Sequence, residues 1–307
     1  MTYVEYTERP ALNRTILILA MSGWPDAAEA ATRSVIELVR LLPATKFASL
    51  DPEDFYDFSQ RRPWVSTTPD GNRKMAWVAN DFYYWQSAEH GHPGGRDILV
   101  FLGSEPHTKW RTYRDAVVAV ALECKVELLL VAGSLLAQTP HTRPPRVMGS
   151  ASKLNLGPGL EHIKFTPPGY EGPSSMTSVL MEAMGSRGIP QASLWGHCPH
   201  YVQMAQNPAI SLALLKEVQS FLPVKLNLSR LSREAEQFQS GLERALLGKG
   251  DISAYVKRLE EMYDADARKP LEQQSSQPEP AELLNDLEEF LRQQRRESTE
   301  DSGEQKS

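Results

Sequence analysis

Four short apolar segments constrain the fold of this chain more than any other feature. They are "RTILILAM" (14–21), "DILVFLG" (97–103), "VELLLVAG" (126–133) and "IPQASLWGH" (189–197). Segments with helical periodicity separate or follow them, at 26–42, 113–125, 174–188 and 207–222. Strands that are apolar on both sides and alternate with amphipathic helices are typical of a parallel sheet covered on both faces. The sequence therefore predicts an α/β protein with a mostly parallel sheet.

Further elements follow from turn signals and composition. "TKFASL" (45–50) predicts a strand, and "PDGN" between β-rich flanks predicts a hairpin over 64–79. We expect an α/β domain over 1–225, a pair of helices in an extension over 226–265, and an acidic, mostly disordered tail over 266–307. Within that tail, Leu284, Leu287 and Leu291 recur at helical spacing, so a short helix is expected over 281–296.

The charge distribution excludes several classes of function. The chain carries a net charge of −6, and residues 271–307 alone carry ten acids and four bases, so the preceding body is neutral. A neutral body offers no basic surface for nucleic acid or anionic lipid. The two cysteines, Cys124 and Cys198, are far apart, and no segment resembles a signal peptide or a membrane span. We therefore expect a cytoplasmic protein that binds neither nucleic acid nor membrane.

The loops after the four apolar strands are the predicted location of any ligand site. In parallel sheets ligands bind beyond the carboxyl ends of the strands. These loops, and the loop before helix 174–188, contain charged and aromatic side chains that we take as candidate ligand-binding residues. The candidates are Trp24, Asp26, Glu105, Trp110, Arg111, His141, Arg143 and Glu171.

Each candidate also has a structural interpretation. Asp26 either points into the cleft or caps the following helix, with Glu29 completing a capping box. Prolines stiffen "TPHTRPP" (139–145), so His141 and Arg143 are presented at low entropic cost to a ligand or an interface. Alternatively, Arg143 forms a salt bridge to a neighbouring loop, through Glu105 or Glu171. Trp110 either stacks on a ligand or packs in the core.

The sequence supports neither a metal site nor a named catalytic set. "HGH" (90–92) and "HCPH" (197–200) lie far apart in sequence and lack zinc-finger spacing, so surface histidines are expected. No GxSxG segment, which would carry a hydrolase serine, is present. We expect no cofactor.

Five stretches in order resemble the bacterial branch of the type-two proteasome assembly chaperone family. They are "LILAMSGWPDAAEAA", "LDPEDFYDFSQRRP", "LVFLGSEPHTKWR", "LLVAGSLLAQTPHTRPPRVMGSAS" and "YEGPSSMTSVL". The resemblance runs from about residue 14 to about residue 264. It implies a three-layer α/β/α fold like that of nucleoside phosphorylases, and self-association, often into trimers. Archaeal relatives carry a docking signature with a tyrosine at the carboxyl terminus, which "EQKS" does not match.

Two hypotheses about function follow. The first, which we favour, is a non-enzymatic homo-oligomer that binds a protein client, as the resemblance to assembly chaperones implies. The second is an enzyme or binder of a small molecule such as a nucleoside or nucleotide, acting through the candidate residues at the strand ends.

Overall fold

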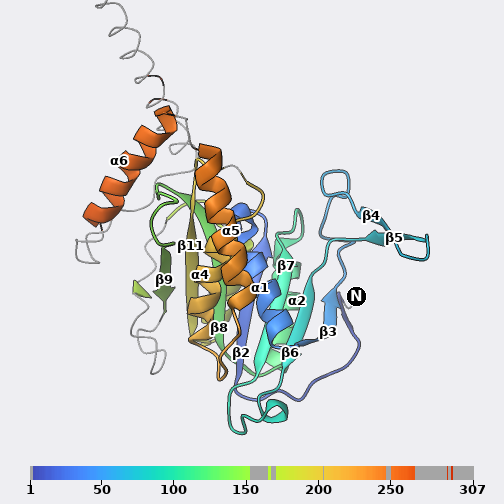
Figure 1. Ribbon diagram of the computed structural model, residues 1–307. Coiled ribbons are helices and arrows are strands. Elements are labelled where there is room, and N and C mark those ends of the chain that lie inside the picture. The colour runs from blue at the N-terminus through green and yellow to red at the C-terminus, as the bar shows by residue number, and fades with distance from the viewer. Residues whose placement is uncertain are drawn as a thin grey trace, which may run out of the picture.

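The computed structural model describes residues 3–152, 165–166, 171–202, 204–246 and 250–266, together with Glu289 and Arg292. Within these residues one sheet has the strand order β1-β3-β6-β7-β2-β8-β11-β9-β10. Its four central strands run parallel to one another, as the apolar segments predict (Figure 1). Their bounds are Ile98–Ser104 (β7), Thr15–Ser22 (β2), Val126–Ala137 (β8) and Gln191–Pro199 (β11).

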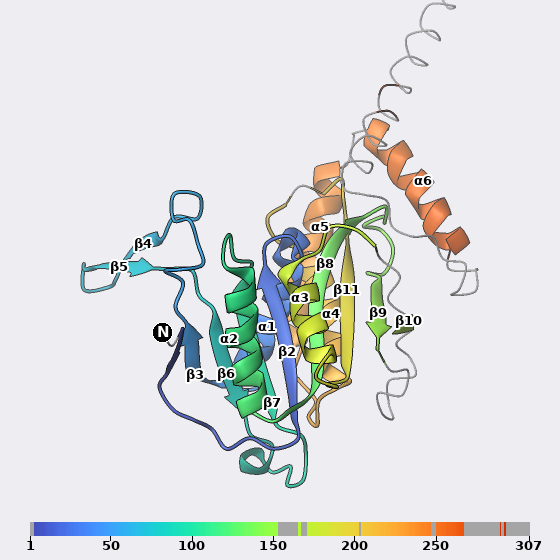
Figure 2. The same cartoon turned by 180° about the vertical axis from the view of Figure 1, so that it is seen from behind.

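The central strands are buried on both faces because helices cover both sides of the sheet. Side chains of β2 alternate between two core clusters, with Leu17 and Leu19 in one and Ile16 and Ile18 in the other. Two helices, α2 (Trp110–Glu123) and α3 (Met176–Gly185), cover the first face. Figure 1 shows the second face and Figure 2 the first. The helices on the second face are α1 (Ala30–Leu41), α4 (Pro208–Gln219) and α5 (Ser229–Leu246). The three-layer α/β/α architecture expected from the family resemblance is confirmed.

The flanks of the sheet are antiparallel, so the sheet is parallel only at its centre. On one side β7, β6, β3 and β1 pair antiparallel in succession, and on the other β9 pairs antiparallel with β11 and parallel with β10. Except for β3, these flanking strands were not expected from the sequence. They are Val4–Tyr6 (β1), Thr45–Leu50 (β3), Asp81–Trp85 (β6), Val147–Ala151 (β9) and Phe165–Thr166 (β10).

The predicted hairpin is present as a separate two-stranded sheet. It pairs β4 (Trp64–Thr67) with β5 (Arg73–Ala76), and Gly71 in the turn adopts a positive φ of 83°. Every residue of both strands is exposed. The hairpin therefore projects from the body, as both views show (Figures 1 and 2).

The expected pair of helices after residue 226 is also present. Helix α5 packs against α4, and its Leu231 is buried in the same core cluster. Helix α6 (Gly250–Asp266) buries Tyr255 and Leu259. Two single-turn 3-10 helices, η1 (Ala27–Glu29) and η2 (Ala88–His90), complete the elements. The helix expected over 281–296 lies outside the described residues apart from Glu289 and Arg292. None of the described helices has the length and apolar character needed to cross a membrane.

Candidate functional site

The four central strands end at one edge of the sheet, because they are parallel neighbours. Their last residues are Ser104, Ser22, Ala137 and Pro199, in the spatial order β7, β2, β8, β11. The loops that carry most of the candidate residues therefore leave the same edge, as the sequence predicts. Hydrogen bonds and ion pairs nevertheless divide the candidates between two ends of this edge.

At the β2–β7 end, Glu105 bonds to backbone amides. Its Oε2 accepts a hydrogen bond from the Trp24 amide at 3.1 Å, and its Oε1 accepts one from the Met176 amide, at the start of α3, at 2.8 Å. The adjacent Gly23 has a φ of 124°, and a Cβ there would lie 2.9 Å from the Glu105 Cβ. Glycine thus allows the loop after β2 to approach the Glu105 side chain closely. Glu105 links the two loops to the first turn of α3.

Asp26 caps helix α1 from a buried position. Its carboxylate accepts hydrogen bonds from the Ala31 amide at 2.9 Å, the Thr32 amide at 3.1 Å and the Thr32 hydroxyl. Burial raises the pKa of Asp26, although the hydrogen bonds from Thr32 act to lower it. Glu29 does not complete the expected capping box, since its carboxylate accepts a hydrogen bond from Gln206 at 2.8 Å. Of the two interpretations of Asp26, the structure supports capping.

The other candidates at this end differ in exposure. Trp110, the first residue of α2, is partly buried and packs against the core cluster. Arg111 is exposed and forms no salt bridge with any described residue. Trp24 is 51% exposed. Glu171 is also exposed and follows residues 167–170, which lie outside the described part of the chain.

A buried polar cluster beneath this end was not predicted. Asn80 Oδ1 accepts hydrogen bonds from the Tyr56 and Tyr113 hydroxyls, both at 2.8 Å, and from the Ser104 amide at 3.0 Å. Burial raises the pKa of Tyr56 to about 12, so the phenol stays protonated and donates. The stretch "LDPEDFYDFSQRRP" contributes Tyr56, but no local signal in it points to Asn80, which follows the hairpin.

At the β8–β11 end, the proline-rich loop is held by helices α5 and α6. The His141 amide and its Nδ1 both lie within hydrogen-bonding distance of the Tyr201 hydroxyl, at 2.8 and 2.6 Å, and its carbonyl accepts from Gln239 of α5 at 2.8 Å. Burial lowers the pKa of His141. Arg143 donates two hydrogen bonds to Asp264, at 3.0 and 2.9 Å, and one to Glu260 at 3.1 Å.

Arg143 thus forms a salt bridge, as one of the two interpretations expected, but not with Glu105 or Glu171. Its partners lie on α6, about 120 residues further along the chain, where sequence reasoning about neighbouring loops could not find them. The prolines fix the loop so that His141 and Arg143 face α5 and α6.

The expectation that the histidines of "HCPH" lie at the surface is wrong for both. His197 and His200 are buried, and His200 lies 3.0 Å from both the Ala137 carbonyl and the Tyr255 hydroxyl of α6. His90 stacks on Trp85, with ring centroids 4.9 Å apart. In the described part of the chain, no three potential ligands come together.

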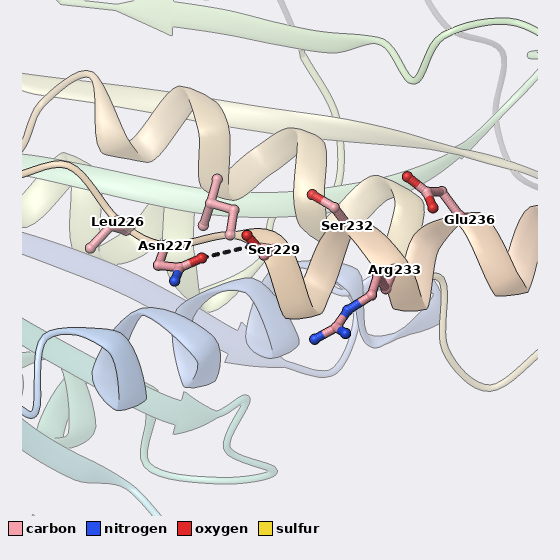
Figure 3. Close-up of a pocket in the computed structure, with 7 residues that line it drawn as sticks. Leu226, Asn227, Ser229, Ser232, Arg233 and Glu236 are labelled. Atoms are coloured by element: carbon pink, nitrogen blue, oxygen red, sulfur yellow. Dashed lines mark hydrogen bonds between the residues drawn. The ribbon is translucent and has the colours of Figure 1, made fainter.

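The candidates thus form two groups. Trp24 and Glu105 lie together over β2 and β7, with Asp26 beneath the same loop, while His141 and Arg143 lie against α5 and α6. A surface hollow is present elsewhere, along the start of α5 (Figure 3). It is lined by Leu226, Asn227, Leu228, Ser229, Ser232, Arg233 and Glu236. A ligand site formed by all the candidates stays a prediction.

The layered sheet with two helices on one face and three on the other, extended by a hairpin and by α6, defines an α/β/α domain with appended surface elements. The model of the PAC2 family matches residues 20–246. This chain belongs to the PAC2 family, which confirms the resemblance to proteasome assembly chaperones seen in the sequence.

Solved structures agree with this assignment. A PAC2 family protein from Streptomyces avermitilis is 35% identical, with a TM-score of 0.69 over 79% of this chain and 99% of its own. A proteasome-assembly chaperone homologue from Mycobacterium tuberculosis is 30% identical, with a TM-score of 0.67 over 78% and 99% of the two chains. PbaB, an archaeal proteasome activator from Pyrococcus furiosus, shares the fold at 19% identity, with a TM-score of 0.63 over 79% and 97%. A search of curated proteins found no match.

Proposed function

We propose that this chain is a self-associating protein-interaction module that binds a protein client, as an assembly chaperone does. Membership of the PAC2 family supports the class, because a relative that is 30% identical is described as a proteasome-assembly chaperone homologue. The proposed client is a protein rather than a small molecule.

One structural observation carries the proposal. Three of the candidate ligand-binding side chains, Asp26, Glu105 and Arg143, are already bonded to the chain's own amides or acids. In contrast, three tryptophans, Trp24, Trp64 and Trp77, are at least half exposed. Exposed tryptophans are typical of interfaces with other proteins.

A reducing compartment such as the cytoplasm is the proposed location. Both cysteines, Cys124 and Cys198, are free and buried. Burial raises the pKa of each thiol to about 12, which keeps the reactive thiolate scarce.

The mass of the full chain in native mass spectrometry, with whatever co-purifies, tests the proposal. We expect multiples of the 34.4 kDa chain mass, with a co-purified protein in stoichiometric amount. A single 34.4 kDa species at every concentration, with no bound protein, contradicts it.

A ligand screen separates this proposal from the alternative of a small-molecule enzyme. Nucleosides, nucleotides and phosphate are added in turn, and the melting temperature is recorded, since a ligand that binds only the folded state raises it. We expect no shift. A shift that is lost in Arg111→Ala supports the small-molecule function instead, because Arg111 is an exposed basic candidate without a salt bridge to described residues.

A further inference from the structure

The hairpin β4–β5 exposes an unusual amount of apolar surface. Trp64 is 75% exposed, Trp77 51%, Val65 48% and Met75 47%. Val65 lies opposite Met75 in the ladder, and Trp77 follows two residues after Met75, so these three side chains share one face. Trp77 also contacts Phe58 edge-to-face, with ring centroids 4.8 Å apart, which anchors the base of the hairpin. Contiguous apolar surface of this kind marks an interaction site.

The same hairpin is basic. Residues 61–77 contain four bases, Arg61, Arg62, Arg73 and Lys74, and one acid, Asp70. Arg61 donates to the Ser22 hydroxyl at 2.8 Å. The other three bases form no salt bridge with any described residue. A partner that is both apolar and acidic would therefore complement the exposed apolar surface and the basic charge of the hairpin.

The chain itself contains a segment with that chemistry. Residues 279–291, "EPAELLNDLEEFL", contain five acids and no base. They also contain five large apolar residues, of which Leu284, Leu287 and Leu291 recur at helical spacing. The apolar residues are Leu283, Leu284, Leu287, Phe290 and Leu291. The body before residue 271 is neutral, so charge complementarity favours this segment over the body of a second copy.

The length of the linker bears on which copy of the hairpin the segment binds. Between Asp266, the last residue of α6, and Glu279 lie 12 residues. Fully extended, they reach about 45 Å, and nine strands about 4.8 Å apart make the sheet about 38 Å wide. Because α6 and the hairpin lie beyond opposite edges of the sheet (Figures 1 and 2), the path within one chain exceeds this width, whereas the hairpin of a second copy is not limited by the linker length.

We propose that residues 279–291 bind the hairpin β4–β5, with the leucine and phenylalanine side chains against Trp77, Met75 and Val65 and the acids facing Arg73, which lies on the same face. This proposal goes beyond the proposed function and does not require self-association. A lone two-stranded hairpin is marginally stable in water, so binding of the segment also protects the hairpin's backbone.

Hydrogen–deuterium exchange of the full-length chain tests this contact. The exchange of the amides of residues 64–76 is compared between the wild type and Leu287→Ser/Phe290→Ser. These substitutions lie outside the described core, and unchanged circular dichroism verifies the fold. We expect hairpin exchange to become about tenfold faster in the variant. The matched control, Glu297→Gln/Glu300→Gln, alters the tail outside the segment and should leave hairpin exchange unchanged.

A charge swap tests the electrostatic part independently. Arg73→Glu alone should speed hairpin exchange by about threefold, and adding Glu289→Lys should restore the wild-type rate. Both positions tolerate the change, since Arg73 is exposed in a two-stranded sheet and residue 289 lies in the tail.

The outcomes are distinct from those of the proposed function. Protection that is independent of protein concentration supports binding within one chain, and protection that rises with concentration supports binding between copies. Equal hairpin exchange in the wild type and in Leu287→Ser/Phe290→Ser at every concentration overturns the inference. An oligomeric mass with hairpin amides that exchange freely would support the proposed function but not this inference. A monomeric mass with hairpin amides protected from exchange would support this inference but not the proposed function.

Discussion

Helix α6 and the hairpin β4–β5 both extend the α/β body, but only α6 buries large apolar side chains. Tyr255 and Leu259 of α6 are fully buried, whereas Trp64 of the hairpin is 75% exposed. Helix α6 is also bonded to the loop after β8, through Arg143 to Glu260 and Asp264. The two elements lie on different sides of the body (Figures 1 and 2).

The comparison shows that a loop is not necessarily available to a ligand because it leaves the sheet at the edge where ligands are expected. The proline-rich loop after β8 leaves the predicted edge, but α5 and α6 already contact it. The hairpin has no such cover from any described element. We therefore expect a partner to bind at the hairpin rather than at the proline-rich loop.

The largest expected effect is acid destabilisation through His197. Burial, with a smaller contribution from the charge of Arg146, lowers the pKa of His197 from 6.5 to about 4. The unfolded chain therefore binds a proton that the folded chain excludes as the pH falls from 6.5 towards 4. The neutral imidazole contributes its full stability above pH 6.5, and this contribution to the free energy of unfolding is about 3 kcal/mol smaller at pH 4. In urea unfolding between pH 7.5 and 4, the free energy of unfolding of the wild type should therefore fall by about 3 kcal/mol more than that of His197→Gln.

His141 acts in the same direction, because burial also lowers its pKa. As a matched control, Ser193→Ala, in the same strand β11, changes no titratable group and should retain the wild-type pH dependence. An identical pH dependence in His197→Gln and wild type would show that His197 does not control acid stability.

The second effect is the release of α6 in Arg143→Ala. The substitution removes the three charged hydrogen bonds to Asp264 and Glu260. Because the Arg143 side chain is only 32% exposed, we expect a loss of about 1 kcal/mol in the free energy of unfolding. Amide exchange in α6 should rise while that of the hairpin does not. Arg111→Ala, an exposed arginine at the other end of the edge, is the control, and equal effects of the two substitutions would contradict the distinction between the ends.

Much of the fold was predictable because it depends on local patterns. The apolar runs in β2, β7, β8 and β11 identify strands buried on both faces, and Asp-Gly at 70–71 identifies the hairpin turn. The flanking strand β9 was missed because it is short, only partly buried and lacks a continuous apolar run. Strand β6 was missed although its aromatic run, Phe82 to Trp85, is typical of a strand. Their antiparallel pairing depends on long-range contacts that no local pattern encodes.

The candidate site was less predictable because bonding partners come from distant elements. Sequence reasoning placed Glu105 and Arg143 at the correct edge, but the amide of Met176 and the carboxylate of Asp264 decide what they do. For Asp26 the local capping interpretation was sufficient, since its partners lie five and six residues away. The exposure of Trp64 and Trp77 was not anticipated, because a β-rich segment with tryptophan is equally typical of a buried strand.

The smallest expected effect is that of Trp64→Ser on stability. Because Trp64 is 75% exposed, its replacement should change the free energy of unfolding by less than about 0.5 kcal/mol. The matched substitution Trp85→Ala removes a tryptophan that is only 3% exposed and should cost about 3 kcal/mol or more. Urea unfolding of both variants gives the comparison. A large loss in Trp64→Ser would mean that the hairpin contributes to the core.

Hydroxyl-radical footprinting of the full-length protein in solution tests the central claim most directly, namely that the hairpin is a binding surface. The rate of oxidation is measured for Trp77, on the face proposed to bind, with the buried Trp85 as the internal reference. If a partner segment or a second copy covers this face of the hairpin, Trp77 should be oxidised nearly as slowly as Trp85 despite its 51% exposure in the single described chain. Oxidation of Trp77 at the rate expected for a half-exposed tryptophan at every protein concentration would contradict the claim.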